Sequence, residues 1–212
     1  MIRTFYAVGS LEALPVVLAE RTSADEGELD VVVLPSAAAF TGVPEACVAI
    51  AEVCNEFAVR VEALMVTDRA STNEPYFAQR LRQADLVVLA DGSSLHARTT
   101  WRNSPVGDAL KQARNLAALG SVASVLGEVM IDPRGGAPTI GLGLFDDVMF
   151  TQPASDEQLV RTRSLVDPAL ALVVLGPRGV IAHDERWRVV CADGVVVTRG
   201  QELSELGLGD RH

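Results

Sequence analysis

The chain has 212 residues, of which 49% are hydrophobic and 22% carry a charge. This length and composition fit one globular α/β domain and exclude a globally disordered chain. The formal net charge of −10 disfavours nucleic-acid binding, because phosphate groups are bound by clustered lysine and arginine side chains. No apolar run approaches the roughly 20 residues of a membrane-spanning helix, so we expect no membrane contact.

We expect a cytoplasmic location. The N-terminus has no long apolar segment followed by a cleavage site, and so no secretion signal is expected. The three cysteines, Cys47, Cys54 and Cys191, are odd in number and form no CxxC motif. Together these features predict reduced thiols in a reducing compartment.

The first half of the chain alternates between strand and helix patterns. Near-continuous apolar runs such as residues 31–34 are typical of strands covered on both faces. The expected strands are 2–8, 29–35, 59–65 and 85–90. The expected helices are 11–21, 44–58, 74–83 with Asn73 as N-cap, and a fourth from Ser104 and Pro105 to about Leu119. Residues 91–96 are expected to form a loop. This order predicts a doubly wound, mostly parallel sheet with helices on both faces.

The second half changes in style. Ser155 is expected to begin a helix, because the acidic residues after it suit a helix N-terminus. Four short strands follow, at 170–175, 179–182, 187–191 and 195–198, with turns at 176–179 and 193–194. These strands predict C-terminal antiparallel hairpins on one edge of the sheet. Residues 1–200 are expected to form one domain, and residues 201–212 a short, polar, acidic tail.

A ligand site is expected at the carboxyl ends of the parallel strands, where open α/β sheets bind their ligands. Four connections lie there: Gly9 with Ser10, and residues 36–40, 91–98 and 121–124. We expect these four segments to converge in space.

Five segments carry a family resemblance. They are VVVLPSA (31–37), ADLVVLADGS (84–93), SPVGDAL (104–110), MIDPRGGA (130–137) and IGLGL (140–144). In this order they resemble the cyanophycinase and dipeptidase E group of serine peptidases. The resemblance implies the class I glutamine-amidotransferase-like fold. It also implies a serine nucleophile in a G-x-S-A-G-like elbow, and a histidine base shortly after the Gly-x-Gly strand.

Two serines are candidate nucleophiles. Counting forward from residues 108–110 places the nucleophile on Ser124, counting back from residues 130–133 places it near Gly120, and Ser121 lies between them. Val125 and Leu126 follow Ser124 where the family has alanine and glycine, and a β-branched residue is unfavourable in a tight, strained elbow. We therefore favour the interpretation that both serines pack a strand end.

The base expected from the resemblance is missing. The family's histidine falls in a segment resembling residues 148–153, where this chain has Gln152 and Pro153. Neither side chain accepts a proton at neutral pH, and a serine hydroxyl is a weak nucleophile without a base. His96, after the fourth strand, is the candidate replacement. The alternative, which we favour, is a loop histidine bonded to the backbone. His183 is expected in an exposed turn, and His212 is terminal.

The candidate oxyanion and substrate-binding residues are Asp91, Gly92, Ser93 and Arg134. The family draws on a Gly-Gly pair where this chain has Asp91 and Gly92. Gly92 still offers an N–H group, whereas an Asp91 carboxylate beside developing negative charge opposes catalysis. Asp91 would instead pair with a cationic ligand or cap the turn. Arg134 and the two glycines after it suit a backbone nest for an anion.

We expect no cofactor and no metal. The glycine pair Gly141 and Gly143 lacks the third glycine of a dinucleotide fingerprint. His183, Asp184 and Glu185 lack partners at metal-ligand spacing. An amidotransferase is disfavoured, because no cysteine lies at the elbow.

Two functions remain. The favoured hypothesis is a relative of the peptidase family whose Ser–His pair is degraded. It would bind a peptide or protein partner, as a homodimer or as a heteromer with an active homologue. The alternative is an active serine peptidase that hydrolyses short peptides, with Ser124 or Ser121 as nucleophile and His96 as base.

Overall fold

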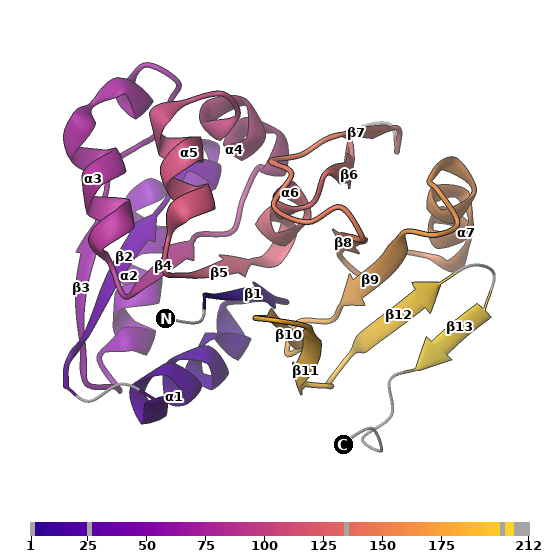
Figure 1. Ribbon diagram of the computed structural model, residues 1–212, viewed down its shortest axis with the longest axis horizontal. Helices are drawn as coiled ribbons and strands as arrows, with labels where there is room; N and C mark the ends of the chain where they lie inside the picture. Colours follow the sequence, from indigo (N-terminus) through magenta and orange to yellow (C-terminus); the bar gives the residue numbers. More distant parts are fainter. Residues whose placement is uncertain (1–2, 25–26, 134–135, 200–201, 206–212) are drawn as a thin grey trace.

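The largest sheet of the protein has seven strands. The computed structural model describes residues 3–24, 27–133, 136–199 and 202–205. The strand order is β11 (Trp187–Cys191), β10 (Val180–His183), β1 (Thr4–Val8), β5 (Asn115–Leu119), β4 (Leu86–Leu89), β2 (Leu29–Leu34) and β3 (Val59–Ala63) (Figure 1). The five strands from β1 to β3 are parallel, whereas β10 and β11 are antiparallel. The predicted α/β fold class, with a mostly parallel sheet and an antiparallel hairpin at its edge, is confirmed.

Helices cover both faces of this sheet because side chains alternate along each strand. On one face, Val31 and Val33 pack with the apolar side of α1 (Leu14–Ala24) and α2 (Val43–Cys54). On the other face, Val32 and Leu34 share a core with α3 (Pro75–Gln83), α4 (Ser94–Trp101), α5 (Pro105–Gln112) and α6 (Ala123–Leu126). The strands are therefore buried from both sides, as their apolar runs predict.

A second sheet lies beside the first. Its order is β13 (Glu202–Glu205), β12 (Val195–Arg199), β9 (Ala171–Leu175) and β8 (Val148–Thr151), and a small hairpin joins β6 (Val129–Ile131) to β7 (Pro138–Ile140). The expectation that all C-terminal strands lie on one edge of the main sheet is thus wrong for β9 and β12, which pair with each other. On its other side, β9 pairs in parallel with β8, a strand that comes before α7 in the sequence. Strand β13 falls within the expected tail.

The helix α7 (Asp156–Leu165) begins as predicted. Ser155 accepts a hydrogen bond from the N–H of Gln158, whose side chain accepts from the N–H of Ser155 in return. This capping box supplies partners for otherwise unpaired groups at the helix start. Among the helices that the structure describes, none is long and apolar enough to cross a membrane.

The predicted helix from Ser104 to Leu119 is wrong beyond Gln112. Residues Asn115–Leu119 form β5, which is fully buried between β1 and β4. Alanine and leucine favour helix, but two neighbours fix the start of this strand. The Asn115 amide accepts a hydrogen bond from the Thr4 N–H (3.2 Å) and donates one to the Asp85 carbonyl (2.7 Å). Tertiary pairing therefore overrides local propensity here.

Two local predictions after β3 and β4 are also corrected. Residues from Ser94 onward form helix α4 where a loop is expected, because the Ser93 hydroxyl caps the helix by accepting from the His96 N–H (3.2 Å). Asn73 is not the N-cap of α3, since Glu74 takes that place and Asn73 ends a short 3₁₀ turn. His96 therefore stands on a helix.

Candidate functional site

Three of the four expected loops meet at the carboxyl end of the sheet. The Ser93 N–H donates to the Ala37 carbonyl (2.8 Å), and the Ser121 N–H donates to the Asp91 carboxylate (2.9 Å). Gly92 has a φ of +149°, and a Cβ there would lie 2.3 Å from the Ala37 oxygen, so only glycine fits this close approach. The convergence of these segments agrees with the position expected for a ligand site.

The fourth segment also lies at the carboxyl end of the sheet, because β1 runs parallel to β5 and Val8 pairs with Leu119. Its own hydrogen bonds, however, go to a different turn. The Gly9 N–H donates to the Gly179 carbonyl (2.8 Å), and the Ser10 hydroxyl donates to the Pro177 carbonyl (2.8 Å). Gly9 and Ser10 thus pack against the turn between β9 and β10. No sequence signal links this turn to the end of β1, because the two are more than 160 residues apart.

The turn of Gly120 to Val122, between β5 and α6, has the shape of an elbow. Gly120 has a φ of +57°, the left-handed conformation that favours glycine. In a nucleophile elbow the nucleophile stands on the strained residue between strand and helix. The left-handed conformation of Gly120 agrees with the count back from residues 130–133.

The Asp91 carboxylate occupies the space that a side chain at position 120 would need. A Cβ added to Gly120 would lie 2.1 Å from Asp91 Oδ2 and 2.2 Å from its Cγ. Asp91 Oδ1 accepts hydrogen bonds from the Gly92 N–H (2.7 Å), the Ser121 N–H (2.9 Å) and the Ser121 hydroxyl (2.9 Å). Of the two roles expected for Asp91, the capping of the turn is therefore the one that its contacts support.

Both candidate serines and Gln152 line one cavity of about 130 Å³, called the elbow cavity below. Its remaining lining residues come from α4, the turn after β5, β6 and the loop after it, β8 and β9: Ser94, Gly120, Ile131, Pro133, Phe150, Thr151 and Leu175. The Ser121 hydroxyl lies 2.5 Å from the Gly92 carbonyl, and the Ser124 hydroxyl donates to the Ser121 carbonyl (2.7 Å). The segment expected to supply a base thus faces the serines, but it presents a glutamine.

The predicted oxyanion donors are engaged. The Gly92 N–H bonds to Asp91 and the Ser93 N–H bonds to Ala37. The Ser93 hydroxyl caps α4. Arg134 and His212 lie outside the described residues.

His96 is bonded to the backbone. Its Nε2 lies 2.7 Å from the Thr67 carbonyl, which only accepts, so this nitrogen carries the hydrogen. Its ring packs edge-on against Phe40, with the ring centroids 4.6 Å apart. Among the described residues, no contact joins His96 to Ser121 or Ser124. This arrangement matches the alternative of a backbone-bonded histidine, although on a helix.

His183 is not in an exposed turn. It ends β10, is half-buried, and packs against Phe145 and Trp187. Within the described parts of the chain, no group of three or more His, Cys, Asp or Glu side chains is placed to hold a metal ion.

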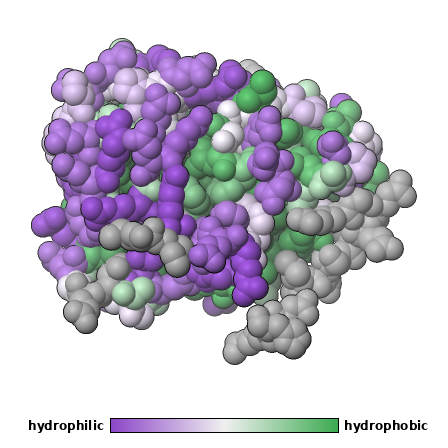
Figure 2. All heavy atoms as spheres, in the orientation of Figure 1, coloured by the Kyte–Doolittle hydropathy of each residue, from purple (hydrophilic) through white to green (hydrophobic). Residues whose placement is uncertain are grey.

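A larger cleft of about 470 Å³ lies between α5 and residues 140–146. Figure 2 shows apolar surface between hydrophilic rims on this face of the molecule. Trp101, Leu142 and Phe145 are apolar lining residues, whereas Lys111 and Asp146 are charged ones. This cleft contains neither candidate serine and is separate from the elbow cavity.

Comparison with known proteins supports the fold. No protein family model matches the chain, and no curated protein does. A solved structure of a peptidase from an acI-B1 Actinobacterium is 19% identical, with a TM-score of 0.79 over 99% of this chain and 96% of that chain. A putative peptidase E protein from Listeria monocytogenes EGD-e is 12% identical, with a TM-score of 0.65 over 94% of this chain and 99% of that chain. At these identities the likeness shows that this chain has a peptidase E-like fold.

Proposed function

We propose that this protein is a catalytically inactive relative of the peptidase E-type serine peptidases, and that it binds a peptide or protein partner. The observation that carries the proposal is the elbow itself. Gly120 occupies the strained position and has no side chain, and the Asp91 carboxylate fills the space beside it. No hydroxyl is therefore presented where the nucleophile of such an elbow stands.

The surrounding residues support the same proposal. A serine attacks a carbonyl only when a general base takes its proton. Gln152 has no basic nitrogen, and among the described residues no contact joins His96 to Ser121 or Ser124. Oxyanion stabilisation needs N–H groups aimed at developing negative charge. The Gly92 N–H is instead bonded to a carboxylate, which would repel that charge.

The size of the elbow cavity indicates what it holds. Small-molecule sites usually span about 300–1,000 Å³, whereas this cavity has about 130 Å³. A single side chain of a peptide or partner protein fits this volume, and a whole dipeptide does not. Binding would therefore insert one side chain beside Ser121 and Ser124.

One contact favours the alternative of an active serine peptidase. The Ser121 hydroxyl lies 2.9 Å from Asp91 Oδ1 as well as 2.5 Å from the Gly92 carbonyl, so a carboxylate is within reach of its proton. We rank this function second, because a carboxylate is a weaker base than imidazole. Ser124 ranks lower still as nucleophile, since its hydroxyl donates to the Ser121 carbonyl and, among the described residues, contacts no carboxylate.

Labelling with a serine-directed fluorophosphonate tests the proposal. We expect no labelling of the wild-type chain and no turnover of dipeptides. Labelling that disappears in Ser121→Ala or Ser124→Ala, but persists in the control Ser164→Ala, would instead establish the alternative. Ser164 lies on α7, where its hydroxyl donates to the Arg161 carbonyl.

Thermal unfolding with a panel of tetrapeptides tests the binding. We expect one or more peptides to raise the Tm of the wild-type chain and not that of Ser124→Phe, whose larger side chain fills the elbow cavity. A peptide that stabilises both proteins equally, or a panel without effect, would contradict peptide binding at this cavity.

A further inference from the structure

Strand β3 leaves one edge of the main sheet open. It is the last strand of the sheet, and among the described residues it pairs only with β2 (Figure 1). The Leu29 N–H donates to the Ala58 carbonyl (3.0 Å), and the Leu64 N–H donates to the Val33 carbonyl (2.9 Å). In a parallel strand pair, the N–H and the C=O of one residue point to the same side of the strand, and those of the next residue point to the other side. The even-numbered residues of this segment therefore bond to β2.

The odd-numbered residues of β3 direct their backbone groups outward. These groups are the N–H of Val61 and Ala63 and the carbonyls of Val59, Val61 and Ala63. The Val59 N–H is already bonded, to the Phe57 carbonyl (2.9 Å). Such a row of unpaired groups is a template for pairing with another strand. We propose that two copies of this chain associate through this edge, with β3 antiparallel to β3 of the partner.

The charges on β3 select this arrangement. Arg60 and Glu62 flank Val61 on the face covered by α3. A two-fold axis at Val61 places Arg60 opposite the partner's Glu62, and Glu62 opposite the partner's Arg60. Opposite charges across an antiparallel pair stabilise it, and like charges destabilise it. A shift of the axis by one residue would set Arg60 against the partner's Arg60, or Glu62 against the partner's Glu62. The sequence therefore fixes the register.

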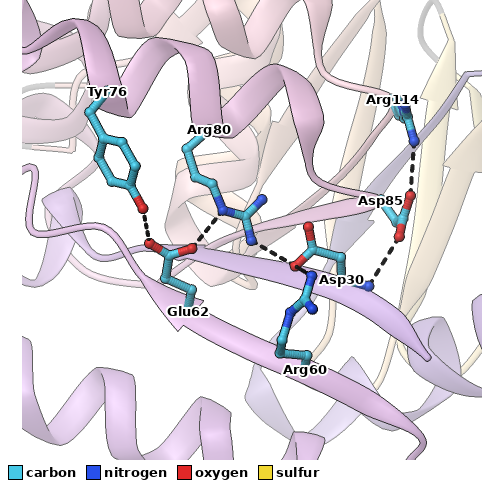
Figure 3. Close-up of polar contacts among 7 residues, drawn as sticks. All are labelled: Asp30, Arg60, Glu62, Tyr76, Arg80, Asp85 and Arg114. Atoms are coloured by element: carbon cyan, nitrogen blue, oxygen red, sulfur yellow. Dashed lines mark hydrogen bonds and ion pairs between the residues drawn. The ribbon is translucent and has the colours of Figure 1, made fainter.

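Glu62 is held in place within its own chain. Figure 3 shows Tyr76 and Arg80 reaching down from α3 to this carboxylate. Arg80 lies 2.6 Å from both Glu62 and Asp30, and its side chain is only 12% exposed. Arg60 contacts Asp30 at 3.2 Å but is 67% exposed. A positioned carboxylate and an accessible guanidinium are suited to a charge pair between copies.

Apolar side chains gather around the same edge. Val59, Val61 and Ala63 are half-buried and pack toward the face covered by α2. Seven large apolar side chains are exposed among the described residues, and three of them lie in segments that adjoin β3: Val48, Met65 and Tyr76. A second copy would cover apolar surface here in addition to pairing the backbone.

Sedimentation velocity with a charge exchange tests the proposal. We expect the wild-type chain to dimerise between about 1 and about 100 μM. In Arg60→Glu, two acidic pairs face each other across the axis, and in Glu62→Arg, two basic pairs do. Each variant should therefore dimerise at least about tenfold more weakly. Mixing the two variants restores both opposite-charge pairs, so the mixture should form a heterodimer.

The controls separate this interface from others. Arg114→Glu reverses a charge that pairs with Asp85 at 3.0 Å, away from the open edge, and should dimerise like the wild-type chain. A wild-type monomer throughout the range would overturn the proposal. So would single variants that remain dimeric, or a mixture no more dimeric than its components.

Hydrogen exchange in the wild-type chain gives a result that does not depend on the folding of any variant. The amides of Val61 and Ala63 should exchange slowly at high concentration and quickly at low concentration. The amides of Arg60 and Glu62 bond to β2 and should exchange slowly at both protein concentrations. Exchange at Val61 and Ala63 that does not change with concentration would contradict the proposed pairing.

Discussion

At the scale of single residues, Gly120 and Asp91 constrain each other. A left-handed backbone costs an ordinary residue about 1–2 kcal/mol, and at position 120 a Cβ would also meet the Asp91 carboxylate at 2.1 Å. Gly143 has a similar φ, +66°, but no atom within 4 Å of where its Cβ would stand. Alanine substitution at Gly143 therefore measures the cost of the left-handed backbone alone, whereas substitution at Gly120 adds the cost of displacing the carboxylate.

We predict that Gly120→Ala destabilises the fold more than Gly143→Ala. Gly143→Ala should lower the free energy of unfolding by about 1 kcal/mol, and Gly120→Ala by about 2–4 kcal/mol, because the carboxylate must also move. In an Asp91→Ala background, Gly120→Ala should cost no more than Gly143→Ala. Urea unfolding of Gly120→Ala, Gly143→Ala and the Asp91→Ala/Gly120→Ala double variant, with wild type and Asp91→Ala as their parents, measures this coupling. An equal cost of Gly120→Ala in both backgrounds would show that Asp91 does not occupy the elbow.

The candidate site was only partly predictable from residues. The resemblance to the peptidase family directs attention to the turn after β5 and to Gln152, and both line the elbow cavity. The choice among Gly120, Ser121 and Ser124 depends on a backbone dihedral, which no residue pattern specifies when the two counts disagree. The contacts of Asp91 with Ser121 could not be predicted either, since 30 residues separate them.

At the scale of elements, a charge network fastens α3 to β2 and β3. Arg80 bridges Asp30 and Glu62. The Tyr76 hydrogen bond lowers the pKa of Glu62, and Arg80 adds to this effect against the opposing effect of burial. Burial also opposes the ionisation of Asp30, but Arg80 and Arg60 outweigh it and lower its pKa. Both carboxylates are therefore more acidic in the folded chain than in the unfolded chain.

We predict that the stabilisation by Arg80 depends on pH. Carboxylates with lowered pKa values stabilise the fold above their unfolded pKa values, 4.5 for Glu62 and 3.8 for Asp30, and this contribution is lost as the pH falls through the folded values. Arg80→Met should thus cost about 1–2 kcal/mol at neutral pH, a modest value because Glu62 is 36% exposed. The gap to wild type should shrink below about pH 4.

Urea unfolding of both proteins across this pH range measures the gap. Arg114→Met is the matched control, because its pair with Asp85 is more exposed and should contribute less. A gap between Arg80→Met and wild type that stays constant from neutral to acidic pH would contradict the role given to the two carboxylates.

The elements differ in how well the sequence predicts them. Strands β2 and β4 were predictable because four or more consecutive apolar residues must be buried on both faces. The start of α5 was predictable because the Ser104 hydroxyl accepts from the Gly107 N–H, a local interaction. Strand β5 was not, because NLAAL suits a helix and only its place between β1 and β4 makes it a strand.

At the scale of the whole molecule, the C-terminal hairpin is fastened to the N-terminal part of the chain. Arg188 on β11 bonds to Glu20 on α1, 168 residues away, and also to Asp184. The Tyr6 hydroxyl donates to Glu20 at 2.7 Å from the fully buried strand β1. Arg188 lowers the pKa of Glu20 although burial opposes this, and Glu20 in turn raises the pKa of Arg188. Strand pairing of β10 with β1 places these groups together.

The contacts of Glu20 with Tyr6 and Arg188, called the clasp below, predict that the protein becomes less stable at alkaline pH. Burial, with the bond to Glu20, raises the pKa of Tyr6 from 10.0 to about 12. A group with a raised pKa stabilises the fold fully below its unfolded pKa, and that contribution is lost as the pH rises through the folded value. The loss between pH 10 and 12 should reach about 2 kcal/mol. We therefore expect the free energy of unfolding of the wild-type chain to fall over this interval.

Absorbance of the phenolate at 295 nm measures the ionisation directly, because the chain has two tyrosines. The later of the two native transitions should be absent in Tyr6→Phe and present in Tyr76→Phe, and both tyrosines should ionise near pH 10 in urea. The late transition should coincide with unfolding followed by circular dichroism, since a Tyr6 phenolate beside Glu20 would place two negative charges in a partly buried contact. A Tyr6 that ionises near pH 10 in the native protein would show that the clasp between β1, α1 and β11 does not form as described.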